Sequence, residues 1–219
     1  MVKLLFVLMN EYRLWALPQA LAALERRYPG AVEGRVYSVR EINADAGLER
    51  ALLADGAAAD MAFLASHGSI QNLYCFSRLW EALEGRPVYF TSTMGDELAE
   101  LLPRLGLEPA LYAALDSYYQ AGSPGDLEGL VLCALTGRFG GDYPLSPPSP
   151  PRGQGVYTLE GFLPPEREAG YRTRMAAETR PVIGVLIHDH YARTGNLEHV
   201  DALLRAIQAR GGVPYALSD

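Results

Sequence analysis

Three residues that follow an apolar run are suited to binding a ligand. The run DMAFLAS is followed by His67, Gly68 and Ser69. An imidazole at the end of a strand, a glycine that permits close approach and a helix start behind it could bind an anion or supply an axial metal ligand. The alternative is that His67 only caps the turn. We therefore treat the three residues as candidate substrate-binding residues with that alternative open.

Polar residues also end two other apolar runs. The run at residues 87–91 ends in Thr91 and Ser92, and the hydroxyl and backbone donors of TSTMG could hold a carboxylate. Simple capping of the next helix by Ser92 is the alternative. Asn10 follows the first apolar run and completes the set of candidate substrate-binding residues.

Two histidines spaced like metal ligands stand in the sequence His188-Asp189-His190. On an extended chain, residues i and i+2 point to the same side, so both imidazoles could reach one ion. Two ligands are too few for a closed site, and a third ligand from elsewhere would be required. A polar surface loop is the alternative for His188 and His190.

Several catalytic signatures are absent from the sequence. It contains no GxSxG nucleophile elbow, no Walker A loop and no GxGxxG fingerprint. We therefore expect no autonomous esterase, ATPase or dinucleotide site, and no catalytic residue is assigned.

The elements that must position these residues alternate along the chain. Short apolar runs at residues 2–9, 35–39, 60–66 and 87–91 alternate with helical spacings, the longest helix beginning at His67-Gly68-Ser69. This order predicts an α/β fold with an open, mostly parallel sheet and helices on both faces, Rossmann-like or flavodoxin-like. Ligands bind such sheets at the carboxyl ends of strands, where the candidate residues fall.

A change in composition divides the chain. We expect an α/β domain over residues 1–138 and a linker or loop rich in proline and glycine over 139–156. Residues 157–219 are expected to form a strand–helix–strand unit that either starts a second domain or completes the sheet.

The last forty residues have the most informative sequence pattern in the chain. Val182–Ile187 reads as a buried strand, residues 188–195 as a polar loop, and residues from Asn196 as an amphipathic helix. A further strand starts at Val213. The sequence stops as this unit is being built, so we expect the chain to be a piece of a longer protein.

Composition excludes several functions. The net charge of −7 and the lack of a run of basic residues argue against nucleic-acid binding. No segment reaches the ~18 apolar residues of a membrane span. The two cysteines, Cys75 and Cys133, lie in apolar patterns without a CxxC motif, which predicts buried thiols and a cytoplasmic location.

The terminal sequence RPVIGVLIHDHYARTGNLEHVDALLRAIQARGGVPYAL resembles a segment of the large subunit of cobaltochelatase and of the porphyrin-binding subunit of magnesium chelatase. The resemblance rests on Arg180-Pro181, the strand near Gly184, the turn at residues 194–196, the helix start at 200–203 and the closing Arg210-Gly211. It is weaker over residues 1–105. The histidines at 188 and 190 depart from the family's usual residues.

This resemblance implies a role in ATP-dependent insertion of cobalt or magnesium into a corrin or porphyrin ring. Its implied partners are a tetrapyrrole substrate and AAA+ ATPase-type chelatase subunits. The chain would correspond to the N-terminal region of the large subunit. It would bind substrate or partner subunits without being catalytic alone, and it would hold no cofactor of its own. The alternative is a standalone α/β ligand-binding or regulatory protein without chelatase activity.

Overall fold

The structure is a computed structural model that describes residues 1–9, 11–150 and 155–218. It divides into two compact units, unit 1 (Met1–Ser149) and unit 2 (Pro150–Asp219). The division falls inside the segment expected to be a linker. We describe each unit by itself.

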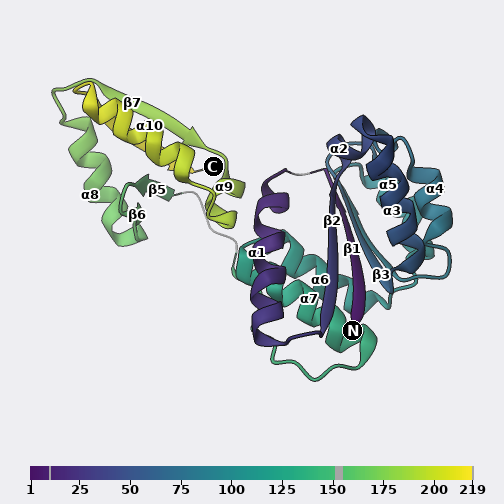
Figure 1. Ribbon diagram of the computed structural model, residues 1–219. Helices are drawn as coiled ribbons and strands as arrows, with labels where there is room; N and C mark the ends of the chain where they lie inside the picture. Colours follow the sequence, from purple (N-terminus) through teal and green to yellow (C-terminus); the bar gives the residue numbers. More distant parts are fainter. Residues whose placement is uncertain (10, 151–154, 219) are drawn as a thin grey trace. The chain divides into compact units, whose positions relative to one another are not determined.

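Unit 1 is a parallel α/β layer structure, as Figure 1 shows. Its four strands follow the order β2-β1-β3-β4, and all three pairings are parallel. Its elements are β1 (Val2–Leu8), α1 (Glu11–Arg27), β2 (Val32–Ser38), α2 (Val39–Ala44), α3 (Ala46–Ala58), β3 (Met61–Ser66), η1 (Ile70–Asn72), α4 (Phe76–Ala82), β4 (Val88–Ser92), α5 (Gly95–Leu101), η2 (Leu102–Arg104), α6 (Pro109–Ala121) and α7 (Pro124–Phe139). The predicted fold class is confirmed.

Helices cover both faces of this sheet because side chains alternate along each strand. Leu4, Phe6 and Leu8 of β1 join the core beneath α1, α6 and α7. Leu5 and Val7 join the core beneath α2 to α5. Both faces of the sheet are therefore shielded from water, which explains why the central strands are continuous apolar runs in the sequence.

Strand β2 begins three residues earlier than the sequence pattern predicted. Glu33 and Gly34 have weak strand preference, so the run seemed to start at Arg35. In the fold, Gly34 leaves room for α1: a Cβ there would lie 2.6 Å from Cδ1 of Leu21. A glycine in this strand thus permits close packing of the helix on the sheet.

The long helix expected after His67 is two shorter pieces, η1 and α4. The side chain of Asn43 in α2 interrupts this helix, because it forms hydrogen bonds with the backbone between η1 and α4. Its Nδ2 donates to the Asn72 carbonyl at 2.6 Å, and its Oδ1 accepts from the Tyr74 amide at 3.1 Å. These backbone groups are consequently satisfied without a continuous helical ladder.

Helices α6 and α7 form a hairpin with well-defined caps. Gly122 ends α6 in the left-handed region at φ 72°, and Ser123 and Asp126 form a capping box at the start of α7. The buried carboxylate of Asp126 also accepts from the Ser149 amide at 2.8 Å. The extended chain after α7 is thereby held against unit 1.

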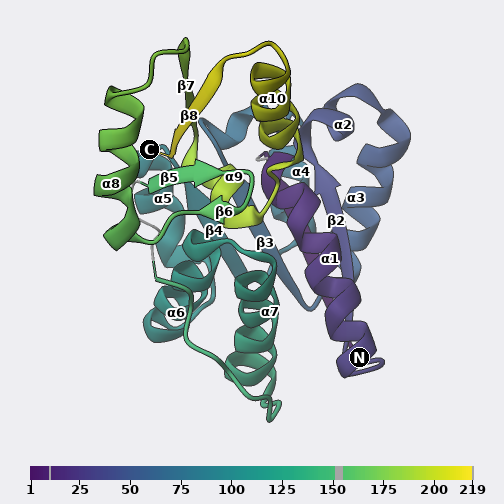
Figure 2. The same cartoon turned by 90° about the vertical axis from the view of Figure 1, so that its left-hand side faces the viewer.

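Unit 2 contains a mixed sheet with the order β6-β5-β8-β7 (Figure 2). Its elements are β5 (Gly155–Thr158), β6 (Gly161–Phe162), α8 (Pro165–Ala176), β7 (Val182–Ile187), α9 (Asp189–Thr194), α10 (Glu198–Ala209) and β8 (Val213–Ser218). Strands β7 and β8 pair in parallel, and β5 is antiparallel to both of its neighbours. A small core of Tyr157, Ile187, Val200, Leu204 and Ala216 holds the unit together.

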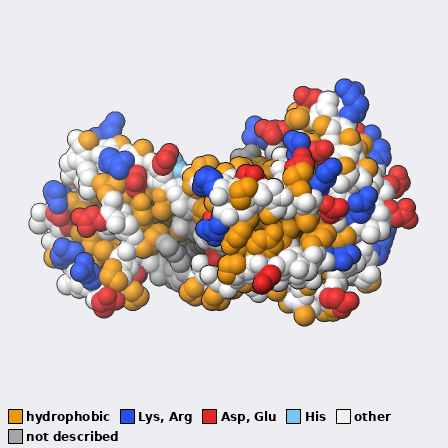
Figure 3. Space-filling model, turned by 60° about the horizontal axis from the view of Figure 1, so that its bottom comes forward, with side chains coloured by type: hydrophobic (Ala, Val, Ile, Leu, Met, Phe, Trp, Pro, Cys, Tyr) orange, Lys and Arg blue, Asp and Glu red, His pale blue; other side chains and the backbone are white. Residues whose placement is uncertain are grey.

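Two features of unit 2 differ from the sequence prediction. The strand expected to be buried is largely exposed, with Leu186 76% accessible and Ile183 44%. Hydrophobic side chains show on the surface of this unit in Figure 3. The polar loop expected at residues 188–195 contains the helix α9, which is anchored by the buried residues Ala192 and Thr194.

The packing of α6 on α7 yields a stability prediction. Gly129 faces the ring of Tyr118, and a Cβ there would lie 2.5 Å from Cε1. We expect Gly129→Ala to destabilise unit 1 by about 1–3 kcal/mol through overpacking, despite the gain in helix propensity. Gly125→Ala in the same helix meets only Ser123 Oγ at 3.9 Å and serves as the control. Urea denaturation of both variants measures the difference, and equal midpoints would contradict the packing.

A tyrosine of unit 2 yields a pH prediction. Burial, followed by a 2.8 Å hydrogen bond to Asp201, raises the pKa of Tyr157 to about 12. Because the folded pKa lies above the unfolded value of 10, this contribution is complete below pH 10 and is lost as pH rises through 12. We expect Tyr157→Phe to flatten the alkaline loss of stability of unit 2. Denaturation at pH 8 and at pH 11 tests this, and an unchanged pH dependence would refute it.

Candidate functional site at the carboxyl ends of β3 and β4

Two neighbouring strand ends bring most of the predicted site residues together. Strands β3 and β4 pair in parallel, with Ser66 opposite Ser92 at their carboxyl ends. The turn at residues 67–69 and the turn into α5 therefore leave the sheet side by side. This is the edge where open α/β sheets bind ligands.

Gly68 links the two turns through its backbone. Its φ of 90° lies in the left-handed region, which a glycine tolerates. Its amide donates to Thr93 Oγ1 at 2.7 Å, and its carbonyl accepts from Ser66 Oγ at 2.5 Å and from Ser92 Oγ at 3.3 Å. These hydrogen bonds hold the two turns together, and close approach of a ligand to Gly68 stays a prediction.

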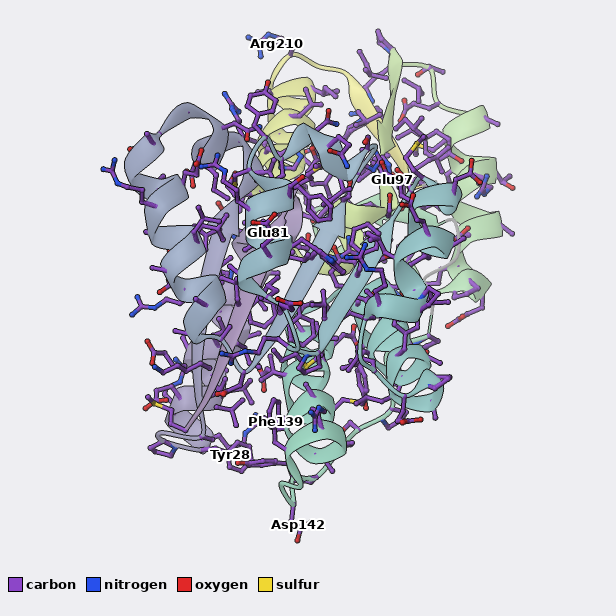
Figure 4. All side chains as sticks on the ribbon, turned by 90° about the vertical axis from the view of Figure 1, so that its right-hand side faces the viewer. Tyr28, Glu81, Glu97, Phe139, Asp142 and Arg210 are labelled. Carbon is purple, nitrogen blue, oxygen red and sulfur yellow. The ribbon has the colours of Figure 1, made fainter. Side chains whose placement is uncertain are left out.

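Glu97 of α5 occupies the centre of this edge. Its Oε1 accepts from Ser69 Oγ at 2.5 Å, and its Oε2 accepts from the Ile70 amide at 2.9 Å. Oε2 also lies 3.4 Å from Ser92 Oγ and shares the single hydroxyl proton of Ser92 with the Gly68 carbonyl. Figure 4 labels Glu97 among the helices that cover this face. Of the donors in residues 91–95 expected to hold a ligand carboxylate, Ser92 Oγ contacts a carboxylate of the chain itself.

The sequence reading missed Glu97. The available signal was an acid in the first turn of the helix that follows β4, which by itself indicates only a favourable helix start. Contact with Ser69 across 28 residues depends on the pairing of β3 with β4.

The hydroxyl groups of Ser69 and Ser92 also accept hydrogen bonds from backbone amides of their own turns. Ser69 Oγ accepts from the Gln71 amide at 3.1 Å, and Ser92 Oγ accepts from the Met94 amide at 3.0 Å. The capping alternative for Ser92 is wrong, because Met94 is the N-cap of α5 and no side chain caps this helix; the bond from Met94 to Ser92 only stabilises the turn before it. Thr91 is half-buried within β4, and the neighbouring Thr93 is the threonine that joins the network.

His67 is exposed at the end of β3. Its imidazole makes no hydrogen bond or ion pair within the part of the chain that the structure describes. An exposed imidazole without such a partner is available to a molecule from outside. Asn10 lies outside the described residues.

The two histidines proposed as metal ligands lie at the start of α9. The chain is helical from Asp189, so the argument that an extended chain turns both imidazoles to one side does not apply. His188 is exposed, and the side chain of His190 lies outside the description. No group of three potential metal-ligating side chains occurs among the described residues. The metal site stays a prediction without its original geometric basis.

Both cysteines are buried free thiols, as predicted. Burial raises the pKa of each thiol. Raised pKa values keep Cys75 and Cys133 in the unreactive thiol form at neutral pH. Neither cysteine supplies a nucleophile to the edge described above.

The comparisons with known proteins place this α/β structure. The chain is similar in fold to the catalytic subunit of cobaltochelatase from Mycobacterium tuberculosis, with a TM-score of 0.58 and 20% sequence identity. That likeness covers 99% of this chain and 16% of the other, so the chain spans about a sixth of the length of that protein. No curated protein matches the chain.

A protein-family model matches part of the chain. Residues 116–218, slightly less than half of the chain, match the CobN/Magnesium Chelatase family model. The match begins within α6 of unit 1 and runs through unit 2 to β8. The resemblance predicted from the terminal sequence is confirmed. No helix in the described part of the chain is long and apolar enough to cross a membrane.

The Glu97 network gives a testable prediction. Both carboxylate oxygens of Glu97 accept hydrogen bonds, whereas Glu97→Gln puts an NH2 group in place of one of them, opposite a hydrogen-bond donor. We therefore expect unit 1 to lose about 1–3 kcal/mol of stability. Glu100→Gln alters an exposed residue of the same helix and serves as the control. Urea unfolding and the amide chemical shift of Ile70 report the effect. A Glu97→Gln protein as stable as the control would show that the hydrogen bonds of Glu97 do not stabilise unit 1.

Proposed function

We propose that this chain is the N-terminal region of the large, tetrapyrrole-binding subunit of an ATP-dependent metallochelatase. The observation that carries the proposal is the family match over residues 116–218, supported by the fold shared with the cobaltochelatase catalytic subunit. The metal, cobalt or magnesium, is cargo of the reaction. We infer that this segment binds the substrate or AAA+ partner subunits and does not insert the metal by itself.

The substrate contact is proposed at the carboxyl ends of β3 and β4. The exposed imidazole of His67 offers a hydrogen bond or an axial contact to the ring. Ser69, Ser92 and Glu97 fix the two turns that present it. Gly68, Thr91 and Asn10 belong to the same proposed contact region.

The inference that this segment is not catalytic follows from the chemistry of metallation. The reaction requires deprotonation of pyrrole N–H groups and delivery of a desolvated metal ion. On the proposed edge, the carboxylate of Glu97 already accepts hydrogen bonds from Ser69 and Ile70 of its own chain. We therefore assign the edge to holding and orienting the ring, and metal delivery to other parts of the complex.

A binding titration tests the proposal. We expect the 219-residue chain to shift the absorption bands of a corrin precursor or of protoporphyrin IX in a saturable manner, and His67→Ala to weaken binding about tenfold. Gln71→Ala, a change at an exposed neighbour, is the control. Absence of any band shift, with no capture of chelatase ATPase subunits by the same chain, would refute a binding role. Equal affinity of His67→Ala and the control would refute only the location.

A further inference from the structure

A cavity at the amino end of β4 lies apart from the edge described above. It has a volume of about 420 Å3 and is bordered by the end of α4, the start of β4 and the residues around η2. Leu83, Pro87 and Val88 supply an apolar wall, and the half-buried indole of Trp80 stands beside it. This volume falls within the range of small-molecule sites.

Three arginines line this cavity in a chain of net negative charge. They belong to Arg86, Arg104 and Arg138, and the carboxylates of Glu81 and Glu84 also line it. Figure 4 labels Glu81 on α4.

One of the three guanidiniums is engaged by the protein itself. Arg86 donates to the carbonyls of Ala57 and Ala59. Arg104 and Arg138 form no ion pair with any carboxylate among the described residues. Two cationic groups are thus available to a ligand.

An aromatic surface accompanies these charges. The guanidinium of Arg104 lies 5.1 Å from the centroid of the Trp80 ring. A planar guanidinium and an indole face both accept an aromatic ring by stacking. Trp80, Glu81 and Arg104 also line an adjoining hollow of about 310 Å3 that reaches Glu97, so the surface offers room beyond the cavity itself.

We propose that this cavity binds a small aromatic carboxylate, a flat ring of one or two fused cycles that carries an acid group. The ring stacks on Trp80 and Arg104 against the apolar wall, and the carboxylate pairs with Arg104 and Arg138. None of the residues of the tetrapyrrole contact proposed above lines this cavity, although the adjoining hollow reaches Glu97.

A probe pair that differs in charge tests the site. In a Trp15→Phe background, Trp80 is the one remaining tryptophan, and its indole N–H gives a single NMR cross-peak. We expect 2-naphthoate to shift this peak in a saturable manner, and the uncharged 2-acetonaphthone to bind at least tenfold more weakly. Arg104→Ala/Arg138→Ala is expected to lose about tenfold in naphthoate affinity. Arg26→Ala, at an exposed position of α1, is the matched control.

The results of these titrations either support or overturn the proposed site. Equal binding of the two probes, an unchanged affinity of the double variant, or no shift of the Trp80 peak would overturn the proposal. If the double variant unfolds, Arg138→Ala alone decides, because Arg104 and not Arg138 is the guanidinium that lies over the Trp80 ring. Displacement of naphthoate by protoporphyrin IX would also overturn the proposal, since the cavity would then belong to the macrocycle. Failure of macrocycle binding at His67 leaves this test unaffected.

Discussion

Burial of the two central strands of unit 1 on both faces is the constraint on which the rest of the structure depends. Phe6 and Phe63 stack at 4.6 Å under one helical layer, while Leu5 and Leu64 lie under the other. Such strands remain dry only if helices cross over on both sides, and parallel pairing with crossovers then follows. Every carboxyl strand end is consequently delivered to one edge, together with the turns at residues 67–69 and 92–95.

At that edge, side-chain hydrogen bonds connect the turn after β3 to the turn after β4, where the strand pairing has ended. Glu97 gathers a serine hydroxyl from each turn and one amide, so three donors that would otherwise need water or a ligand are satisfied within the chain. The internal carboxylate stiffens the two turns relative to each other. The exposed His67 is therefore presented from a fixed frame, which favours a positioned contact over an adaptable one.

The sequence allowed the fold class and the strand order along the chain to be predicted because long apolar runs and helical spacings are local signals. The break of the helix after His67 could not be predicted, because it depends on Asn43, which only the fold brings to Asn72 and Tyr74. Glu97 was missed for the same reason. The exposure of Leu186 escaped prediction because a short apolar run has the same pattern whether or not its second face is covered.

The two ends of β4 differ in the charged groups that they offer, and this difference bears on where ligands bind. At the carboxyl end, donors meet a carboxylate of the chain, so an incoming anion must compete with Glu97. At the amino end, Arg104 and Arg138 form no ion pair among the described residues and line a cavity in which three arginines outnumber two glutamates, Glu81 and Glu84. The rule that ligands bind at carboxyl ends rests on helix starts and open crevices. Where the chain fills that crevice with its own acid, the opposite end becomes the better site for an anion.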